Sequence, residues 1–167
     1  MKFNYNLPVN LIFGRGRIVE IGNETLKYGK KAIIVTGRNS TKKSGLLDKT
    51  VNLLNDAGIE SVIFDKVEQN PLTTTAYEGA ELAKKEKCEV VIGLGGGSIM
   101  DAAKSIAFIA VNDGDVSDYI FGKKSSDKAL PIILVPTTCG TGSEGNGFAV
   151  LTNPDNNDKK SLRCNAI

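Results

Sequence analysis

Histidine and tryptophan are both absent from this sequence of 167 residues. Without histidine, the chain by itself can form neither a Ser-His-Asp triad, nor a Cys-His dyad, nor a His-ligated metal site. Aromatic residues make up only 6% of the sequence, so an aromatic platform that stacks nucleic-acid bases is not expected. These absences argue against a hydrolase triad, a metal site with histidine ligands and base stacking on nucleic acid within this chain.

Cysteine is scarce, and the spacing of the three cysteines does not indicate a disulfide framework. Cys88, Cys139 and Cys164 are odd in number and form no C-x-x-C motif. We therefore expect reduced thiols in a cytoplasmic protein. The apolar run Ile106–Val111 is too short to span a bilayer. The sequence turns polar within residues 1–6, which predicts no signal peptide and no membrane partner.

An excess of charge of one sign is also missing, whereas glycine is abundant. Lys and Arg number 21 and Asp and Glu 19, giving a net charge of +2. Nucleic-acid binders usually carry clustered positive charge, so nucleic acid is not an expected partner. Glycine occurs 18 times, which predicts several loops of unusual geometry.

Apolar runs of strand length alternate with segments of helical periodicity. The expected strands are Ala32–Thr36, Ser61–Phe64, Glu89–Leu94 and Pro131–Val135. The expected helices are Ile18–Tyr28, Leu46–Ala57, Ala76–Lys87 and Ser98–Val111. This alternation predicts an α/β fold with a parallel sheet flanked by helices. Phe148–Thr152 and Lys159–Cys164 look like a hairpin, and residues 112–128 look like a surface excursion.

The first segment that indicates chemistry is Gly95–Lys104, which follows an expected strand and opens an expected helix. Such a turn lies at the carboxyl edge of a parallel sheet, where ligands bind. Helix-terminal amides and three successive glycines favour a phosphate site. A capping box with Ser98 as N-cap and Asp101 bonded to its amide is a simpler interpretation, and both can hold together.

Two further segments follow expected strands. Residues 136–145 (PTTCGTGSEG) offer hydroxyls and glycines at the same edge, although an irregular loop without a ligand would look similar. After Ala32–Thr36 comes Gly37, where an acidic residue would bond the ribose hydroxyls of NAD and repel a 2′-phosphate. Gly37 with Arg38 therefore favours NADP if a dinucleotide binds; a solvated basic turn is the alternative.

At these residues the sequence resembles the iron-containing (group III) alcohol dehydrogenase family. The resemblance covers nearly the whole chain, including residues 11–16, 32–37 and 70–71, and it is most specific over Gly95–Lys104 and Pro136–Glu144. It implies a Rossmann-like, dehydroquinate-synthase-like dinucleotide-binding domain over residues 1–167. NADP-preferring members similar to butanol dehydrogenases are the nearest in pattern, because Gly37 replaces the acidic residue of NAD-preferring ones.

The resemblance implies that one group of residues binds the middle and the nicotinamide end of the cofactor. Gly96, Gly97 and Ser98 would hold the pyrophosphate. Asp101 would line the cleft near the nicotinamide.

A second group is implied to contact or border the adenosine half. Thr137 and Thr138 would contact it, and Thr141 would lie close by. Asn70 and Pro71 would border the same cleft.

The remaining implied contacts concern the riboses. Gly37, Asn39 and Ser40 would meet the adenosine 2′-phosphate. Either Lys159 or Lys160 matches a lysine near a ribose, and the turn length leaves open which one.

The same resemblance implies hydride transfer between NADP(H), or less favourably NAD(H), and a small alcohol or aldehyde. Family members are more than twice as long, and a second, helical domain supplies one Asp and three His ligands for Fe²⁺ or Zn²⁺. The present chain contains no such ligand set, so neither catalytic nor metal-binding residues are expected in it. We expect no turnover by the chain alone, and a homo-oligomer.

Two other functions remain open on the sequence. The chain could belong to a glycerol-dehydrogenase-like or dehydroquinate-synthase-like relative that has a related fold and another substrate. It could also be a stand-alone nucleotide-binding regulatory module.

Overall fold

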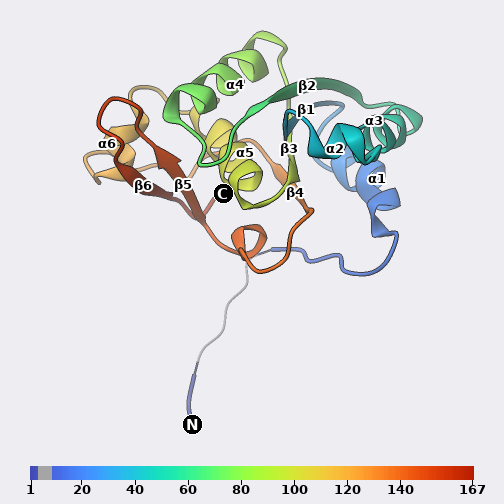
Figure 1. The fold of residues 1–167 in the computed structure, drawn as a ribbon, viewed down its shortest axis with the longest axis horizontal. Coiled ribbons are helices and arrows are strands. Elements are labelled where there is room, and N and C mark those ends of the chain that lie inside the picture. Colours follow the sequence, from blue (N-terminus) through green and yellow to red (C-terminus); the bar gives the residue numbers. More distant parts are fainter. Residues whose placement is uncertain (4–8) are drawn as a thin grey trace.

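A four-stranded, wholly parallel sheet forms the centre of the protein (Figure 1). The computed structural model describes residues 1–3 and 9–167, so the polar start of the chain, residues 1–6, lies partly outside the described residues. In spatial order the strands are β2 (Glu60–Val67), β1 (Lys31–Gly37), β3 (Val90–Gly95) and β4 (Ile132–Pro136). The parallel sheet that the alternating pattern predicts is confirmed.

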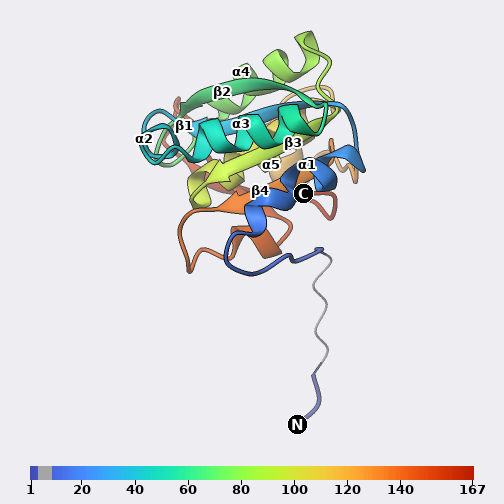
Figure 2. The same cartoon turned by 90° about the vertical axis from the view of Figure 1, so that its right-hand side faces the viewer.

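Helices cover both faces of this sheet. The 3-10 helix η1 (Arg17–Glu20), α1 (Ile21–Leu26) and α3 (Leu46–Asp56) lie on one face (Figure 2). The other face carries α4 (Thr73–Lys85) and α5 (Gly97–Ile109), which pack against each other. A sheet covered on both faces needs strands that are apolar throughout, as the sequence shows.

Successive residues of a strand point to opposite faces of the sheet, and this divides the core into two clusters. On β1 and β3, Ile33 and Val91 face α4 and α5, whereas Ile34 and Ile92 face α1 and α3. All four side chains are completely buried. Strand β3 is buried along its whole length because it has a neighbour on each side and helices above and below.

The predicted hairpin is also present. Strands β5 (Phe148–Thr152) and β6 (Lys159–Arg163) pair antiparallel, and β5 packs against α5. Leu151 and Leu162 fix the hairpin by burying their side chains in the α4–α5 side of the core.

Several local expectations are wrong. The helix expected over 18–28 is split, because a 3-10 turn precedes the short α1. Two short helices, α2 (Ser40–Lys43) and α6 (Val116–Ile120), were not expected. Helix α6 lies within the 112–128 excursion and is capped by the Asp115 carboxylate, which accepts a bond from the Ser117 amide at 2.8 Å.

The start of α4 lies earlier than expected. The helix begins at Thr73 rather than at Ala76, and its N-cap, Leu72, makes no side-chain hydrogen bond. Instead the Thr75 hydroxyl donates to the Glu68 carboxylate at 2.8 Å. The partner of the Thr75 hydroxyl is thus a side chain seven residues earlier, and not a backbone group at the start of the helix.

The cysteines match the expectation of free thiols. Cys88 and Cys164 are buried, Cys139 is exposed, and all three are unpaired. Among the helices in residues 1–3 and 9–167, none combines the length and the apolar character needed to cross a bilayer.

Candidate functional site

The segments that follow β1, β3 and β4 begin at one edge of the sheet, because the three strands run in the same direction. The ends of β3 and β4 are in register, with Gly95 opposite Pro136. The Thr137 amide extends this pairing by donating to the Gly95 carbonyl at 2.9 Å. Ligands of doubly wound sheets bind at this carboxyl edge.

The turn after β3 presents the amino end of α5. Gly96 is the N-cap in an extended conformation, and the helix begins at Gly97. The amides at the start of an α-helix have no partner within the helix, and the dipole makes this end positive. The amides of Gly97 and Ser98 are therefore suited to an anion.

The expected capping box does not form. Ser98 lies inside the helix rather than at its N-cap, and the N-cap has no side-chain bond. The Asp101 carboxylate instead accepts from the Ser143 hydroxyl at 2.7 Å and from the Val150 amide at 3.2 Å. The local pattern failed because partners more than 40 residues away in sequence hold the carboxylate.

The two glycine-rich segments touch each other. A Cβ atom on Gly96 would lie 3.0 Å from Thr138 Oγ1, and a Cβ atom on Gly97 would lie 2.9 Å from Thr141 Cγ2. Both distances are shorter than ordinary van der Waals contacts. Only glycine at these two positions therefore lets Thr138 and Thr141 approach the start of α5 this closely.

A third segment, residues 70–71, reaches the same helix end. The Asn70 amide donates to Ser98 Oγ at 3.4 Å, and its side-chain oxygen accepts from Lys159 Nζ at 2.7 Å. Pro71 is buried behind it, and its carbonyl accepts from the Thr152 amide at 2.9 Å. Asn70, Ser98 and Lys159 thus form one connected group.

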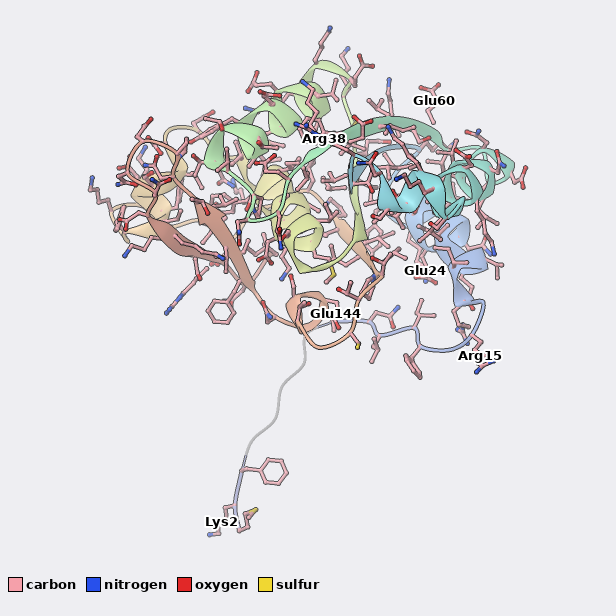
Figure 3. The ribbon with its side chains drawn as sticks, viewed as in Figure 1. Lys2, Arg15, Glu24, Arg38, Glu60 and Glu144 are labelled. Carbon is pink, nitrogen blue, oxygen red and sulfur yellow. The ribbon has the colours of Figure 1, made fainter. Side chains whose placement is uncertain are left out.

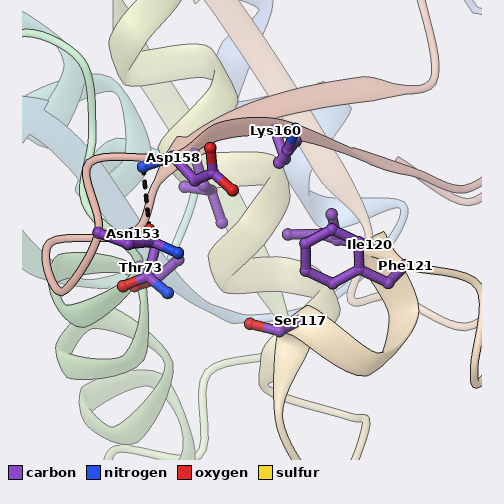
Figure 4. A pocket seen from close by; sticks show the side chains of 9 residues that line it. Thr73, Ser117, Ile120, Phe121, Asn153, Asp158 and Lys160 are labelled. Carbon is purple, nitrogen blue, oxygen red and sulfur yellow. Dashed lines mark hydrogen bonds between the residues drawn. The ribbon is translucent and has the colours of Figure 1, made fainter.

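Lys160 is placed elsewhere. Neighbouring strand residues point to opposite faces, and Lys160 lines a small pocket between α4, α6 and the hairpin (Figure 4). This pocket shares no lining residue with the glycine-rich segments; it is lined by Thr73, Ser117, Ile120, Phe121, Leu151, Asn153, Asn156, Asp158 and Lys160. Of the two candidate lysines, the structure brings Lys159 to Asn70.

The segment after β1 forms the side of the edge toward β2. A Cβ atom on Gly37 would lie 3.5 Å from Ile99 Cδ1, an ordinary contact, so Gly37 adjoins the first turn of α5. Arg38, Asn39 and Ser40 are exposed. Nearby, the Lys42 ammonium bonds the Asp65 carboxylate and holds its pKa below the usual value.

Lys104 on α5 is 1% exposed, and no role was expected for it from the sequence. Its ammonium donates to the Asn146 and Phe148 carbonyls at 2.6 and 2.9 Å. Burial lowers the pKa of Lys104 to about 8, although the carboxylates of Asp101 and Glu144 act in the opposite direction. The sign of this role in the sequence is that Lys104 is the one charged residue in the apolar run that follows Asp101.

Glu144 lies on η2 (Ser143–Gly145), in the loop that follows β4 (Figure 3). Its Oε2 atom is buried and, within the described part of the chain, has no hydrogen-bond partner. In the same part of the chain, no three His, Cys, Asp or Glu side chains are grouped in a way that could hold a metal ion.

The chemical character of this edge fits a dinucleotide better than a metal or a catalytic dyad. Free helix amides, close-packed glycines and hydroxyls are the groups that bind a pyrophosphate. In a comparison with known proteins, the family model described as "Iron-containing alcohol dehydrogenase" matches residues 8–167. The chain belongs to the iron-containing alcohol dehydrogenase family.

Known members of this family are similar in sequence to this chain over most of its length. NADH-dependent butanol dehydrogenase B of Clostridium acetobutylicum is 38% identical over 159 residues, which are 95% of this chain and 41% of that protein. The chain thus spans about two fifths of the length of that relative.

Solved structures of family members show the same fold. NADH-dependent butanol dehydrogenase A from Thermotoga maritima has a TM-score of 0.92 and 40% identity, over 99% of this chain and 42% of that one. Sulfoacetaldehyde reductase from Bifidobacterium kashiwanohense, solved in complex with NAD⁺, has a TM-score of 0.88 and 34% identity, over 99% and 44%. The expected Rossmann-like fold is confirmed.

Proposed function

We propose that residues 1–167 form the dinucleotide-binding domain of a metal-dependent alcohol dehydrogenase that interconverts alcohols and aldehydes. The observation that carries this proposal is the contact between the two glycine-rich segments, in which Thr138 and Thr141 lie against Gly96 and Gly97. That contact gathers hydroxyls and free amides where a pyrophosphate needs them.

Each part of the edge would have a distinct task. The Gly97 and Ser98 amides would bind the pyrophosphate, and Asn70 with Lys159 would close the cleft beside Ser98. When bound, the nicotinamide supplies the carbon that accepts or donates a hydride. Asp101 would orient the neighbouring segment rather than move a proton, because both its oxygens accept hydrogen bonds.

The metal would be held outside these residues. The chain contains no histidine, so a site for Fe²⁺ or Zn²⁺ like the one that the family resemblance implies needs ligands from further sequence. We therefore expect the 167-residue chain to bind the dinucleotide without oxidising alcohols, even when Fe²⁺ or Zn²⁺ is added.

We propose NADP as the preferred cofactor. Support comes from Gly37 at the end of β1, which carries no carboxylate to repel a 2′-phosphate, and from exposed Arg38 next to it. The relatives named NADH-dependent show that the family includes members that use NADH, so this preference needs a direct measurement.

We also propose that the protein is cytoplasmic and forms a homo-oligomer. Three unpaired cysteines suit a reducing compartment. The side chains of Leu11 and Phe13 are 65% and 88% exposed, and neighbouring exposed apolar side chains are typical of surfaces that associate.

Calorimetric titration of the purified chain with NADP⁺, NAD⁺, ATP and a cyclic nucleotide tests the function. Saturable binding of NADP⁺ or NAD⁺ with little binding of ATP is the expected result, and tighter binding of NADP⁺ supports the finer assignment. A preference for ATP or the cyclic nucleotide would favour a regulatory module. Binding of none of the four would refute a dinucleotide site.

A further inference from the structure

Lys104 lies at the centre of a network that joins α5 to the segment after β4. The side chain is buried, and its ammonium donates to three acceptors: the Asn146 carbonyl at 2.6 Å, Asn146 Oδ1 at 3.3 Å and the Phe148 carbonyl at 2.9 Å. An ammonium has three hydrogens to donate, so all of them are used within this one segment.

Asn146 extends the network along the segment. Its side-chain nitrogen donates to the Gly142 carbonyl at 2.7 Å, and its side-chain oxygen accepts from the Phe148 amide at 2.9 Å. One turn earlier on α5, the Asp101 carboxylate holds the Ser143 hydroxyl and the Val150 amide. Residues 142–150, which follow Thr141 directly, are thereby attached to α5 through two charged side chains.

A buried charge needs a reason other than filling space. An apolar side chain of similar size would fill the core without the desolvation cost of an ammonium. The segment is irregular before β5 begins at Phe148, however, so no strand supplies a partner for the Asn146 carbonyl. Charge-assisted bonds from Lys104 to this carbonyl and to the Phe148 carbonyl fix the path of the segment.

We propose that Lys104 is a positioning residue, which clamps residues 142–148 to α5 and thereby holds Thr141 against the helix amides for dinucleotide binding. This inference rests on the proposed function, because the benefit of the clamp is the binding geometry at Gly97. The hydrogen bonds described for the Lys104 ammonium go to that segment, and Lys104 lies on the third turn of the helix whose first turn would face the ligand.

The clamp makes binding dependent on pH. The charged groups that act on Lys104 are Asp101 on α5 and Glu144 on η2, and burial outweighs both to leave its pKa at about 8. Below that pH the ammonium makes three charge-assisted bonds. Above it the neutral amine has only two hydrogens to donate, so the segment loosens and affinity falls.

Lys104→Met, Lys104→Arg and Lys84→Met are the variants for the test. Methionine keeps most of the length and removes the charge, whereas arginine keeps the charge. Lys84 is a surface lysine paired with Glu81 at 3.0 Å, so its replacement controls for loss of a lysine outside the site. Dissociation constants for NADP⁺ and NAD⁺ are measured between pH 6.5 and 9.5, and amide hydrogen exchange of residues 142–150 is measured without ligand.

For the unmodified chain, affinity should fall as the pH rises through about 8. Lys104→Met should weaken binding about ten-fold at pH 7, equivalent to the loss of one charged hydrogen bond, and should show no inflection near pH 8. Lys104→Arg should recover part of the affinity, and Lys84→Met should match the unmodified chain. Exchange of residues 142–150 should rise only in Lys104→Met.

Cys139→Ser is a second control, made in the same loop. Cys139 is exposed there, so its replacement tests whether the inflection belongs to Lys104. The inflection should persist in this variant. Its loss there, or its persistence in Lys104→Met, would overturn the proposal.

The exchange experiment distinguishes failure of this inference from failure of the proposed function. Unchanged exchange of residues 142–150 in Lys104→Met would refute the clamp, whatever the ligand results. Raised exchange without dinucleotide binding by any form would support the clamp as a structural device and refute its role in the proposed function.

Discussion

At the residue scale, Gly97 is the position where a single methyl group should have the largest effect on binding. In Gly97→Ala the new Cβ would lie 2.9 Å from Thr141 Cγ2, so the exposed Thr141 must move away from the helix amides. We expect affinity for the dinucleotide to fall about ten-fold, with little loss of stability, as measured by calorimetry and urea unfolding.

Gly58→Ala is the matched control for that prediction. Gly58 has a φ of +75° and lies between α3 and β2, at the opposite edge of the sheet. Alanine there should cost about 1 kcal/mol of stability and leave affinity unchanged. The reverse pattern, with Gly97→Ala binding normally, would contradict the contact described between the two segments.

Gly37 is the residue on which cofactor choice should depend. A Cβ atom at this position meets Ile99 at an ordinary 3.5 Å, so an aspartate can be accommodated. Gly37→Asp should weaken NADP⁺ binding about ten-fold, because a carboxylate repels the 2′-phosphate, and leave NAD⁺ binding equal or tighter. Gly37→Ala, which adds bulk without charge, should weaken neither; equal loss of both cofactors in Gly37→Asp would contradict the prediction.

At the element scale, strand β6 of the hairpin is expected to contribute only one of its two neighbouring lysines to the site, because adjacent strand residues point to opposite faces. Lys159→Met removes the bond to Asn70 and should reduce dinucleotide affinity about five-fold, in the range of one exposed charged contact. Lys160→Met changes the neighbouring residue, whose side chain lines the separate pocket, and should have no effect. Titration of both variants under one buffer condition checks the contrast.

The elements also show how far a sequence can predict this fold. Strands such as β1 and β3 are recognisable because a sheet covered on both faces demands unbroken apolar runs. Helix α6 was missed because it is only five residues long and lies within a polar stretch of the sequence, where Asp115 caps it. The capping box failed because Asp101 and Ser143 meet only after folding brings residues 42 apart in sequence together.

In the candidate site too, the sequence predicts local patterns but not contacts between distant residues. Glycine-rich turns after strands are local patterns, and the sequence predicts their place at one edge. The choice between Lys159 and Lys160 depended on the length of a turn and so needed the structure. The partners of Lys104 lie more than 40 residues away along the chain, so spacing alone gives no sign of them.

At the scale of the whole molecule, stability should depend on the central strand. Ile92 on β3 is completely buried between the sheet and the α1–α3 layer. Ile92→Ala should lower the free energy of unfolding by about 2–5 kcal/mol. Ile63→Ala, the same change on β2 where the side chain is 44% exposed, should cost less than about 1 kcal/mol. Urea unfolding of both variants tests this; similar losses would contradict the described core.

The distribution of thiols has a practical consequence. Within the described residues, Cys139 is the exposed cysteine, whereas Cys88 and Cys164 are buried. A maleimide dye added under native conditions should therefore attach beside Thr138. Its emission would provide an optical readout of how the neighbouring turn responds when a molecule arrives.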